Sequence, residues 1–259
     1  MKIAKMPDGT PEVYLAVNGE GMTTGLPTVF VRTSSCNLHC TFCDTFYTWN
    51  FEGTKFSTKH DYAPKVNMIA EQMVIPSEEL AKIIIEKAGN VRAVTFTGGE
   101  PTIQQFNIVS TIQELKKQSK DEWFVEVETN GTLMLQAPFV KLLDQINCSP
   151  KLSSSGNEKI LRQQEPVIRS MYEIAQFKQV GLCFKFVIRQ ENLEHDMQEV
   201  KEWQKDMKMP SKYIYLMPEG IEKDKILEGT AVLEEICMET GYKLSTRLQI
   251  LIHGPKRAT

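Results

Sequence analysis

The sequence predicts an α/β fold whose parallel strands form a partial barrel of the (β/α)6 type. Short runs rich in β-branched and aromatic residues alternate with amphipathic stretches along the 259 residues. Such alternation implies parallel strands joined by right-handed crossovers. Polar residues also recur just after successive strands, at the face where parallel barrels hold their sites. Periodicity by itself leaves a complete barrel and an open doubly wound sheet as alternatives.

The strands are expected in apolar runs that contain many β-branched and aromatic residues. A short strand comes first, and the better-defined strands follow it along the chain. In order, the expected strands cover residues 12–17, 28–33, 91–97, 123–128, 145–149, 182–188 and 212–217.

Helices are expected between the strands, because apolar residues recur there with helical spacing. The first helix begins with Ser77 as its N-cap, and Glu78 and Glu79 in its first turn complement the helix dipole. Its apolar face is formed by Leu80, Ile83 and Ile84. The later helices are expected over residues 103–117, 137–143, 158–179, 192–208 and 221–240. We interpret the apolar faces of all these helices as core packing.

Residues 47–76 break the alternation, because they are polar and aromatic with little periodicity. We interpret them as an insertion and as a candidate lid. We expect residues 1–259 to form a single domain, in which residues 245–259 are a C-terminal tail close to the functional site.

The composition is that of an ordinary globular protein, with 41% hydrophobic and 24% charged residues. The formal net charge of −3 argues against nucleic acid as a partner, since nucleic-acid-binding domains are usually strongly basic. No run approaches the ~18 apolar residues of a membrane span, and the first residues lack the apolar core of a signal peptide. We therefore expect a cytoplasmic protein with no membrane partner, in a reducing compartment.

The cysteines carry the strongest functional signal. Three of the 6 have the spacing C-x3-C-x2-C, at Cys36, Cys40 and Cys43, directly after a predicted strand. In a reducing compartment, such a group indicates metal binding or catalysis rather than disulfides. A closed zinc site needs four ligands, and beyond His39 no second ligand pair is visible. Three thiolates instead suit a [4Fe–4S] cluster with one iron left open. The isolated cysteines, which we expect to be buried structural thiols, are Cys148, Cys183 and Cys237.

The cysteine segment resembles the radical S-adenosylmethionine (SAM) superfamily, in which the amino and carboxylate groups of SAM chelate the open iron. Phe42, just before the last cysteine, fits the superfamily pattern, and the Gly-Gly-Glu-Pro sequence at 98–101 is similar to its second motif. The resemblance implies a [4Fe–4S] cluster and SAM as cofactors, in a partial radical SAM barrel with an insertion after the cluster loop.

Further segments resemble one family within this superfamily, the 7-carboxy-7-deazaguanine synthases. They are NGEG at 18–21, PTVFVR at 27–32, CNL at 36–38, CDT at 43–45, ETNG at 128–131 and SPK at 149–151. The resemblance implies conversion of 6-carboxy-5,6,7,8-tetrahydropterin to 7-carboxy-7-deazaguanine with loss of ammonia, in 7-deazapurine and queuosine biosynthesis. A 5′-deoxyadenosyl radical from SAM would take a hydrogen atom from the pterin and later return it. A homodimer and a flavodoxin or ferredoxin reductant are also implied.

The resemblance assigns roles to individual residues. Cys36, Cys40 and Cys43 would hold the cluster. Thr45, whose hydroxyl is a hard oxygen ligand, would bind Mg²⁺, and the planar fork of Arg32 would bind the substrate carboxylate. The residues expected at SAM are Phe42, Asp44, Gly99, Glu100, Glu128, Ser149, Pro150 and Lys151. The other residues expected at the substrate are Val17, Asn18, Gly19, Glu20, Thr97 and Gln249.

Several positions depart from the family pattern. Asn18 stands where glutamine is common, Ser35 where glycine is usual, and Gln249 near a position where some relatives carry a titratable histidine. Four residues follow Pro255, near which some relatives present a terminal carboxylate. A glycyl-radical-enzyme activase would share the cysteines and the Gly-Gly-Glu-Pro segment, and it is the alternative enzyme. A zinc-binding or interaction protein is the alternative from another class.

Overall fold

The computed structural model of the protein describes residues 1–54 and 65–259. The central part of the predicted 47–76 insertion, residues 55–64, lies outside the described residues, and so does the part of the candidate lid that it would form. The described end of the insertion contains helix α1 (Met68–Glu71) and strand β4 (Gln72–Val74), so it contributes regular structure to the fold.

The described residues form a sheet of 10 strands in the order β10-β9-β8-β7-β6-β5-β3-β1-β4, with β2 paired to β3 off this path. The remaining strands are β1 (Lys2–Ala4), β2 (Val13–Val17), β3 (Pro27–Thr33), β5 (Ala93–Gly98), β6 (Phe124–Thr129), β7 (Gln145–Cys148), β8 (Gly181–Ile188), β9 (Ile214–Pro218) and β10 (Lys243–Leu244).

From β3 to β10 the neighbouring strands are parallel, whereas β1, β2 and β4 pair antiparallel. The path ends at β10 on one side and β4 on the other, and no pairing within the described residues joins them. The predicted α/β fold with a largely parallel sheet is confirmed, and the sheet is an open, partial barrel. Each predicted strand is present within two residues of its expected ends, whereas β1, β4 and β10 were not predicted.

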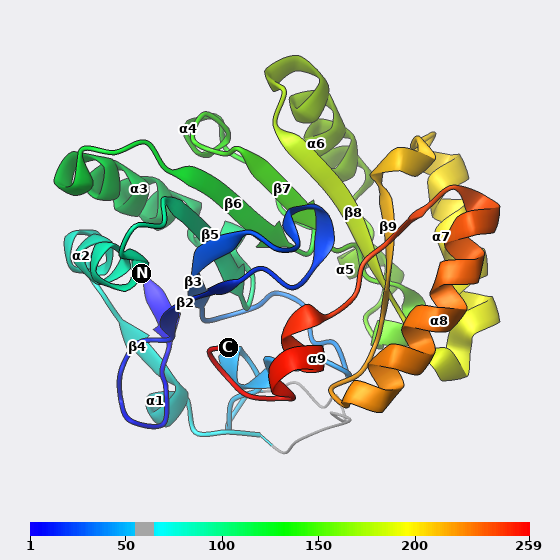
Figure 1. Ribbon diagram of the computed structural model, residues 1–259, viewed down its shortest axis with the longest axis horizontal. Helices are drawn as coiled ribbons and strands as arrows, with labels where there is room; N and C mark the ends of the chain where they lie inside the picture. The colour runs from blue at the N-terminus through cyan, green and yellow to red at the C-terminus, as the bar shows by residue number, and fades with distance from the viewer. Residues whose placement is uncertain (55–64) are drawn as a thin grey trace.

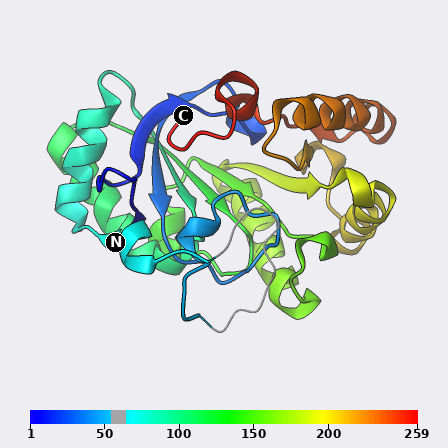
Figure 2. The same ribbon diagram turned by 90° about the horizontal axis from the view of Figure 1, so that it is seen from below.

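Helices lie around the outside of the curved sheet (Figure 1). They are α2 (Ser77–Ala88), α3 (Gln105–Ser119), α4 (Ala137–Val140), α5 (Lys159–Arg162), α6 (Glu165–Lys178), α7 (Leu193–Met207) and α8 (Lys223–Thr240). The last helix, α9 (Leu248–His253), lies instead beside the β2–β3 hairpin, as Figures 1 and 2 both show. A backbone hydrogen bond from Leu248 N to Gly19 O (3.0 Å) fixes it there.

The helix prediction was wrong in three details, one of which is that the helix expected over 137–143 ends at Val140. Ser77 is the first residue of α2 rather than its N-cap, because extended Pro76 precedes it and no side chain caps the helix. The single helix expected over 158–179 is divided into α5 and α6. Pro166 stands in the first turn of α6, where its missing N–H removes no helical hydrogen bond. The same proline would break a helix that continued through this position.

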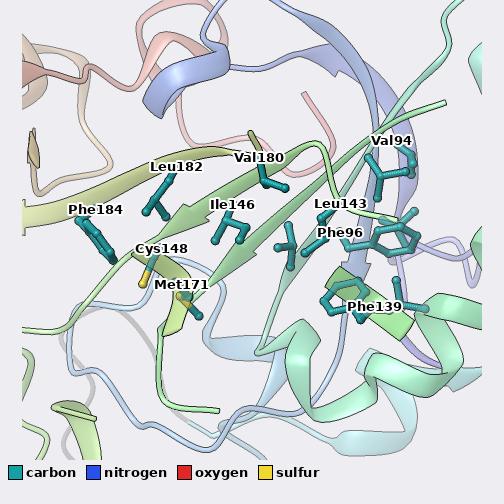
Figure 3. Packing of buried hydrophobic residues seen from close by; sticks show 14 of the residues in the cluster. Val94, Phe96, Phe139, Leu143, Ile146, Cys148, Met171, Val180, Leu182 and Phe184 are labelled. Carbon is teal, nitrogen blue, oxygen red and sulfur yellow. The ribbon is translucent and has the colours of Figure 1, made fainter. Parts of the chain in front are cut away.

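The core fills the space between the sheet and the outer helices. Figure 3 shows Phe96 and Ile146 of the sheet, which belong to one hydrophobic cluster with Phe139 of α4 and Met171 of α6. These four side chains are completely buried. Burying one such side chain stabilises the fold by roughly 1.5–3 kcal/mol. The helices are thereby held on the outer face, and the carboxyl ends of the strands are left to form a site.

No helix within the described residues is both long and apolar enough to cross a membrane.

Candidate active site

A cavity of about 530 Å³ opens at the carboxyl ends of the parallel strands. Segments that follow β3, β5, β6, β7 and β9 all line it, together with the β2–β3 hairpin, α9 and the last residues of the chain. The residues that line it come from widely separated parts of the chain, from Tyr14 near one end to Thr259 at the other. This volume is in the range of pockets that hold small molecules and cofactors.

The three clustered cysteines follow β3 and all line this cavity. The glycine pair after β5 packs directly against the start of their loop: Gly99 N donates to Thr33 O (2.9 Å) and Glu100 N donates to Ser35 O (2.8 Å). A Cβ on Gly98 would lie 2.4 Å from Thr33 O, and one on Gly99 would lie 2.1 Å from Ser35 O. Only glycine allows the two loops to approach so closely.

Each cysteine sulfur accepts an N–H from outside the C-x3-C-x2-C motif. Nδ2 of Asn157 donates to Cys40 Sγ (3.3 Å), and Nε1 of Trp49 donates to Cys43 Sγ (3.3 Å). Nδ2 of Asn130 lies 3.9 Å from the Sγ of the first cysteine, Cys36. Sequence reasoning assigned no role to Asn157, whose only signal is its place shortly after the Ser-Pro-Lys segment that follows β7.

The three cysteines are suited to hold an iron–sulfur cluster. Their sulfurs line one cavity and have N–H donors aimed at them, as cluster thiolates do. Among the described residues, no group of three His, Cys, Asp or Glu side chains converges closely enough to hold one ion.

Glu100 and Pro150 do not line the cavity, although both were expected at SAM. The carboxylate of Glu100 is fully buried and accepts from Thr129 Oγ1 (2.7 Å), Asn130 N (2.7 Å) and both donors of Thr102. These hydrogen bonds hold the segment after β5 against the segment after β6. Burial raises the pKa of Glu100, while these hydrogen bonds oppose the shift.

Glu20 lies at the centre of a charged network on the cavity wall. It forms ion pairs with Lys185 of β8 and with Arg247, and it accepts from Gln249 Nε2 (2.6 Å). Burial alone would raise the pKa of Glu20, but the two cations outweigh it and hold the pKa below its ordinary value. Arg247 also pairs with Asp44, so this network joins the hairpin, β8, the cluster loop and the tail.

Lys185 and Arg247 are cavity residues that sequence reasoning missed. Lys185 is nearly buried within an apolar strand, and a buried lysine needs a counter-charge. That requirement was a usable signal. Arg247 left none, because its partners lie in segments remote from it in the chain.

Asn18 lines the cavity, but its side-chain hydrogen bonds are made within the protein. Its Nδ2 donates to Glu126 (2.8 Å) and Thr23 (2.9 Å), and its Oδ1 accepts from Glu20 N (3.0 Å). The neighbouring Gly19 allows Gln249 to approach, since a Cβ there would lie 1.9 Å from Gln249 Oε1. That oxygen is buried without a hydrogen-bond partner in the part of the chain that the structure describes.

The other predicted residues are brought together at the cavity. Thr97 Oγ1 donates to Glu128 Oε2 (2.5 Å), and Lys151 Nζ donates to Ser149 Oγ (2.8 Å). Thr45 precedes a short 3-10 turn, but its side chain makes no capping hydrogen bond. The remaining predicted residues that line the cavity are Val17, Arg32, Phe42 and Gly99.

Comparison with known sequences identifies the class of protein. The family model described as the Radical SAM superfamily matches residues 30–161, which include the cysteine triad and the segments after β5 and β6. The chain therefore belongs to the radical SAM superfamily.

Close relatives narrow the assignment. A 7-carboxy-7-deazaguanine synthase of Rhodopirellula baltica is 30% identical over 257 residues, which cover 96% of this chain and 87% of the relative. One from Pyrobaculum aerophilum is 26% identical, with 95% of each chain covered. Within the superfamily, the chain belongs to the 7-carboxy-7-deazaguanine synthase family.

A solved structure supports the fold. The crystal structure of QueE from Escherichia coli aligns with 95% of this chain and 93% of that chain, with a TM-score of 0.60 at 22% identity. At this identity the likeness extends to the fold, and it agrees with the open, largely parallel sheet described above.

Proposed function

We propose that this protein is a radical SAM enzyme that converts 6-carboxy-5,6,7,8-tetrahydropterin to 7-carboxy-7-deazaguanine with loss of ammonia. The observation that carries the proposal is a single cavity that joins the cysteine triad to the polar residues expected at a pterin carboxylate. The near full-length similarity to 7-carboxy-7-deazaguanine synthases supports the same substrate and a place in queuosine biosynthesis.

Cys36, Cys40 and Cys43 would hold the [4Fe–4S] cluster. When bound, the cluster and SAM supply a radical able to remove a hydrogen atom from an unactivated carbon. The residues proposed to contact SAM are Phe42, Asp44, Gly99, Glu100, Glu128, Ser149, Pro150 and Lys151, and all of them except Glu100 and Pro150 line the cavity. Lys151 offers a cation for the SAM carboxylate, and Glu128 offers an acceptor.

Thr45 would provide an oxygen ligand for Mg²⁺. Thr45 lines the cavity, and its hydroxyl lies 3.5 Å from Cys43 Sγ and does not cap the following turn. Oxygen ligands are those Mg²⁺ prefers, and the ion usually completes its shell with water and substrate oxygens. The substrate carboxylate would supply one of these oxygens and would also pair with Arg32.

The pyrimidine edge of the pterin, which has amino and N–H donors beside a carbonyl, would face Glu20 and Gln249. The unpartnered Oε1 of Gln249 supports this placement, because a buried acceptor without a donor favours a ligand that brings one. Lys185 and Arg247 share Glu20 and would donate to the carbonyl on the same edge. Thr97 would contact the substrate from the end of β5.

For the assembly, we propose a single-domain protomer that forms a homodimer and receives electrons from a flavodoxin or ferredoxin. The glycyl-radical-enzyme activase is the weaker candidate, because the relatives reported above are 7-carboxy-7-deazaguanine synthases over nearly the whole chain.

Anaerobic turnover tests the proposal. Reconstituted protein is incubated with SAM, Mg²⁺, a reductant and carboxytetrahydropterin, and the products are identified by mass. The expected product is 7-carboxy-7-deazaguanine, with ammonia released in equal amount. Deoxyadenosine formation without any deazaguanine would keep the superfamily chemistry but defeat the proposed substrate.

A further inference from the structure

The C-terminal tail carries an arginine that is built into the wall of the cavity. Arg257 Nη2 donates to Glu12 Oε2 (2.8 Å), and its Nη1 donates to Glu71 Oε2 (2.9 Å). Its guanidinium lies 3.6 Å from the centre of the Tyr47 ring, a stacked cation–π position. These contacts join the tail to three segments from the first third of the chain.

Glu12 is the carboxylate that Arg257 and Arg32 both contact. It is fully buried, and besides Arg257 it accepts from Arg32 Nε (3.1 Å) and from the Tyr47 hydroxyl (3.0 Å). Arg32 also donates from Nη2 to the Tyr14 hydroxyl (2.8 Å). Two guanidinium groups therefore share one buried carboxylate, and one of them, Arg32, lines the cavity.

Arg257 affects how strongly the positive charge of Arg32 can attract an anionic ligand. If Glu12 paired with Arg32 alone, the two charges would cancel, and Arg32 would attract an anionic ligand weakly. Arg257 supplies a second positive charge to Glu12 and shares its own charge with Glu71, so Arg32 does not neutralise Glu12 alone and keeps more of its charge for a ligand. Arg32 is meanwhile held by Glu12 and Tyr14, so its other donors stay in a fixed direction.

We propose that Arg257 is a positioning residue that makes the Arg32 site selective for a substrate with a carboxylate. The inference deepens the proposed function and rests on it. Arg257 acts through Glu12 rather than by touching the substrate, so its effect belongs to substrate binding rather than to the chemical step.

The test uses cluster-loaded enzyme with SAM, and compares wild type, Arg257→Ala and the double variant Glu12→Gln/Arg257→Ala. Arg257→Ala is expected to raise KM for carboxytetrahydropterin by about tenfold with kcat changed less than about twofold. The double variant is expected to recover most of this loss, because the neutral amide that replaces the carboxylate no longer cancels the charge of Arg32. Arg257→Lys, which keeps the charge, is expected to lie close to wild type.

The matched control is Glu71→Gln/Arg257→Ala. Glu71 also pairs with Arg257, but it makes no ion pair with Arg32, so this double variant is expected to stay as impaired as Arg257→Ala. Equal recovery in both double variants would overturn the inference, because it would reveal a general charge effect. An unchanged KM in Arg257→Ala would overturn it directly.

A binding measurement distinguishes a failure of this inference from a failure of the proposed function. Wild type is expected to bind the carboxylated pterin about tenfold more tightly than the pterin without the carboxylate, and Arg257→Ala is expected to lose that preference. Equal binding of both pterins by wild type would defeat the carboxylate pairing at Arg32, and with it this inference. A preference that survives in Arg257→Ala would defeat only the role of Arg257.

Discussion

The side chain of Asn157 makes two hydrogen bonds to the cysteine loop. Its Nδ2 donates to Cys40 Sγ (3.3 Å), while its Oδ1 accepts from His39 N (2.8 Å). A hydrogen bond to a cluster sulfur stabilises the more negative, reduced state. Asn157 should therefore affect the potential of the cluster as well as the shape of its loop.

We expect Asn157→Ala to make the cluster harder to reduce. The ratio of reduced to oxidised protein at a fixed potential should fall by up to about tenfold, which is about 59 mV for a one-electron couple. A redox titration followed by electron paramagnetic resonance measures it. Ser155→Ala is the control, since Ser155 bonds to Asn157 but not to a sulfur. If Asn157→Ala and Ser155→Ala have the same reduction potential, the hydrogen bond to the sulfur has no separate effect.

Thr45 permits a second test at this scale. Thr45→Ala should lower turnover by roughly tenfold or more at limiting Mg²⁺, because it removes an oxygen ligand. Thr45→Ser keeps the hydroxyl and should retain the Mg²⁺ response. The measurement is turnover against Mg²⁺ concentration for the three proteins. An alanine variant that follows the wild-type curve would remove Thr45 from this role.

The sequence predicts positions at the site better than it predicts contacts. Most residues expected there line the cavity, because the carboxyl ends of parallel strands meet at one edge. The sequence could not reveal that Glu100 accepts hydrogen bonds from Thr129 and Asn130, or that Asn18 donates to Glu126. Those partners lie far along the chain, and their proximity depends on strand order. Lys185 did leave a signal, as a lysine inside an apolar strand.

At the element scale, β6 contains a buried acid that should make stability depend on pH. Glu126 accepts from Asn18, Asn147 and Thr23, and burial raises its pKa from 4.5 to about 7. The folded state therefore binds this proton more tightly than the unfolded state does. Its contribution is favourable at low pH, and stability should fall as the pH rises from 4.5 to about 7.

Glu126→Gln should abolish this dependence. A glutamine side chain can accept both amides at one atom and donate to Thr23 from the other, so the hydrogen bonds are kept. At pH 8 the variant should be more stable, by up to about 3 kcal/mol at 1.36 kcal/mol per pKa unit. Urea unfolding between pH 5 and pH 8 measures the difference. A wild-type protein whose stability does not fall over this range, relative to the variant, would contradict the prediction.

The long helices and strands could be predicted from the local sequence pattern. The strand at β8 and the helix at α8 contain enough periodic residues to be recognised alone. By contrast, β1, β4 and β10 contain two or three residues each, so they form only because a neighbouring strand offers hydrogen bonds. The break between α5 and α6 was readable from Pro166, but the periodicity of the flanking residues hid it.

At the scale of the whole molecule, the cavity is closed by segments from both ends of the chain. Glu12, near the amino terminus, is paired with Arg257, near the carboxyl terminus. Sequence patterns cannot indicate such a pairing, since the two residues are 245 positions apart in the chain. It requires the complete sheet, which places the β2–β3 hairpin next to α9 (Figure 2). The site is thus a property of the assembled fold rather than of any one motif.

The 6 cysteines provide a test at this scale, because the fold divides them into two groups. Cys36, Cys40 and Cys43 line the cavity, whereas Cys148, Cys183 and Cys237 are buried away from it. A cluster that binds the folded state and not the unfolded one stabilises the fold by mass action. Reconstituted wild type should therefore contain about four irons, and it should melt roughly 10 °C above its own apo form.

Two single variants distinguish the groups. Cys40→Ala should lose most of the iron, SAM cleavage and the difference in melting temperature, because the cluster would retain only two thiolates. Cys237→Ala, which removes a buried thiol from α8, should melt lower in both forms but keep the iron and the difference between them. Comparing each variant with its own apo form cancels the cost of the substitution. Loss of iron from Cys237→Ala to the same extent would contradict the division, because a thiol outside the cavity would then be needed for the cluster.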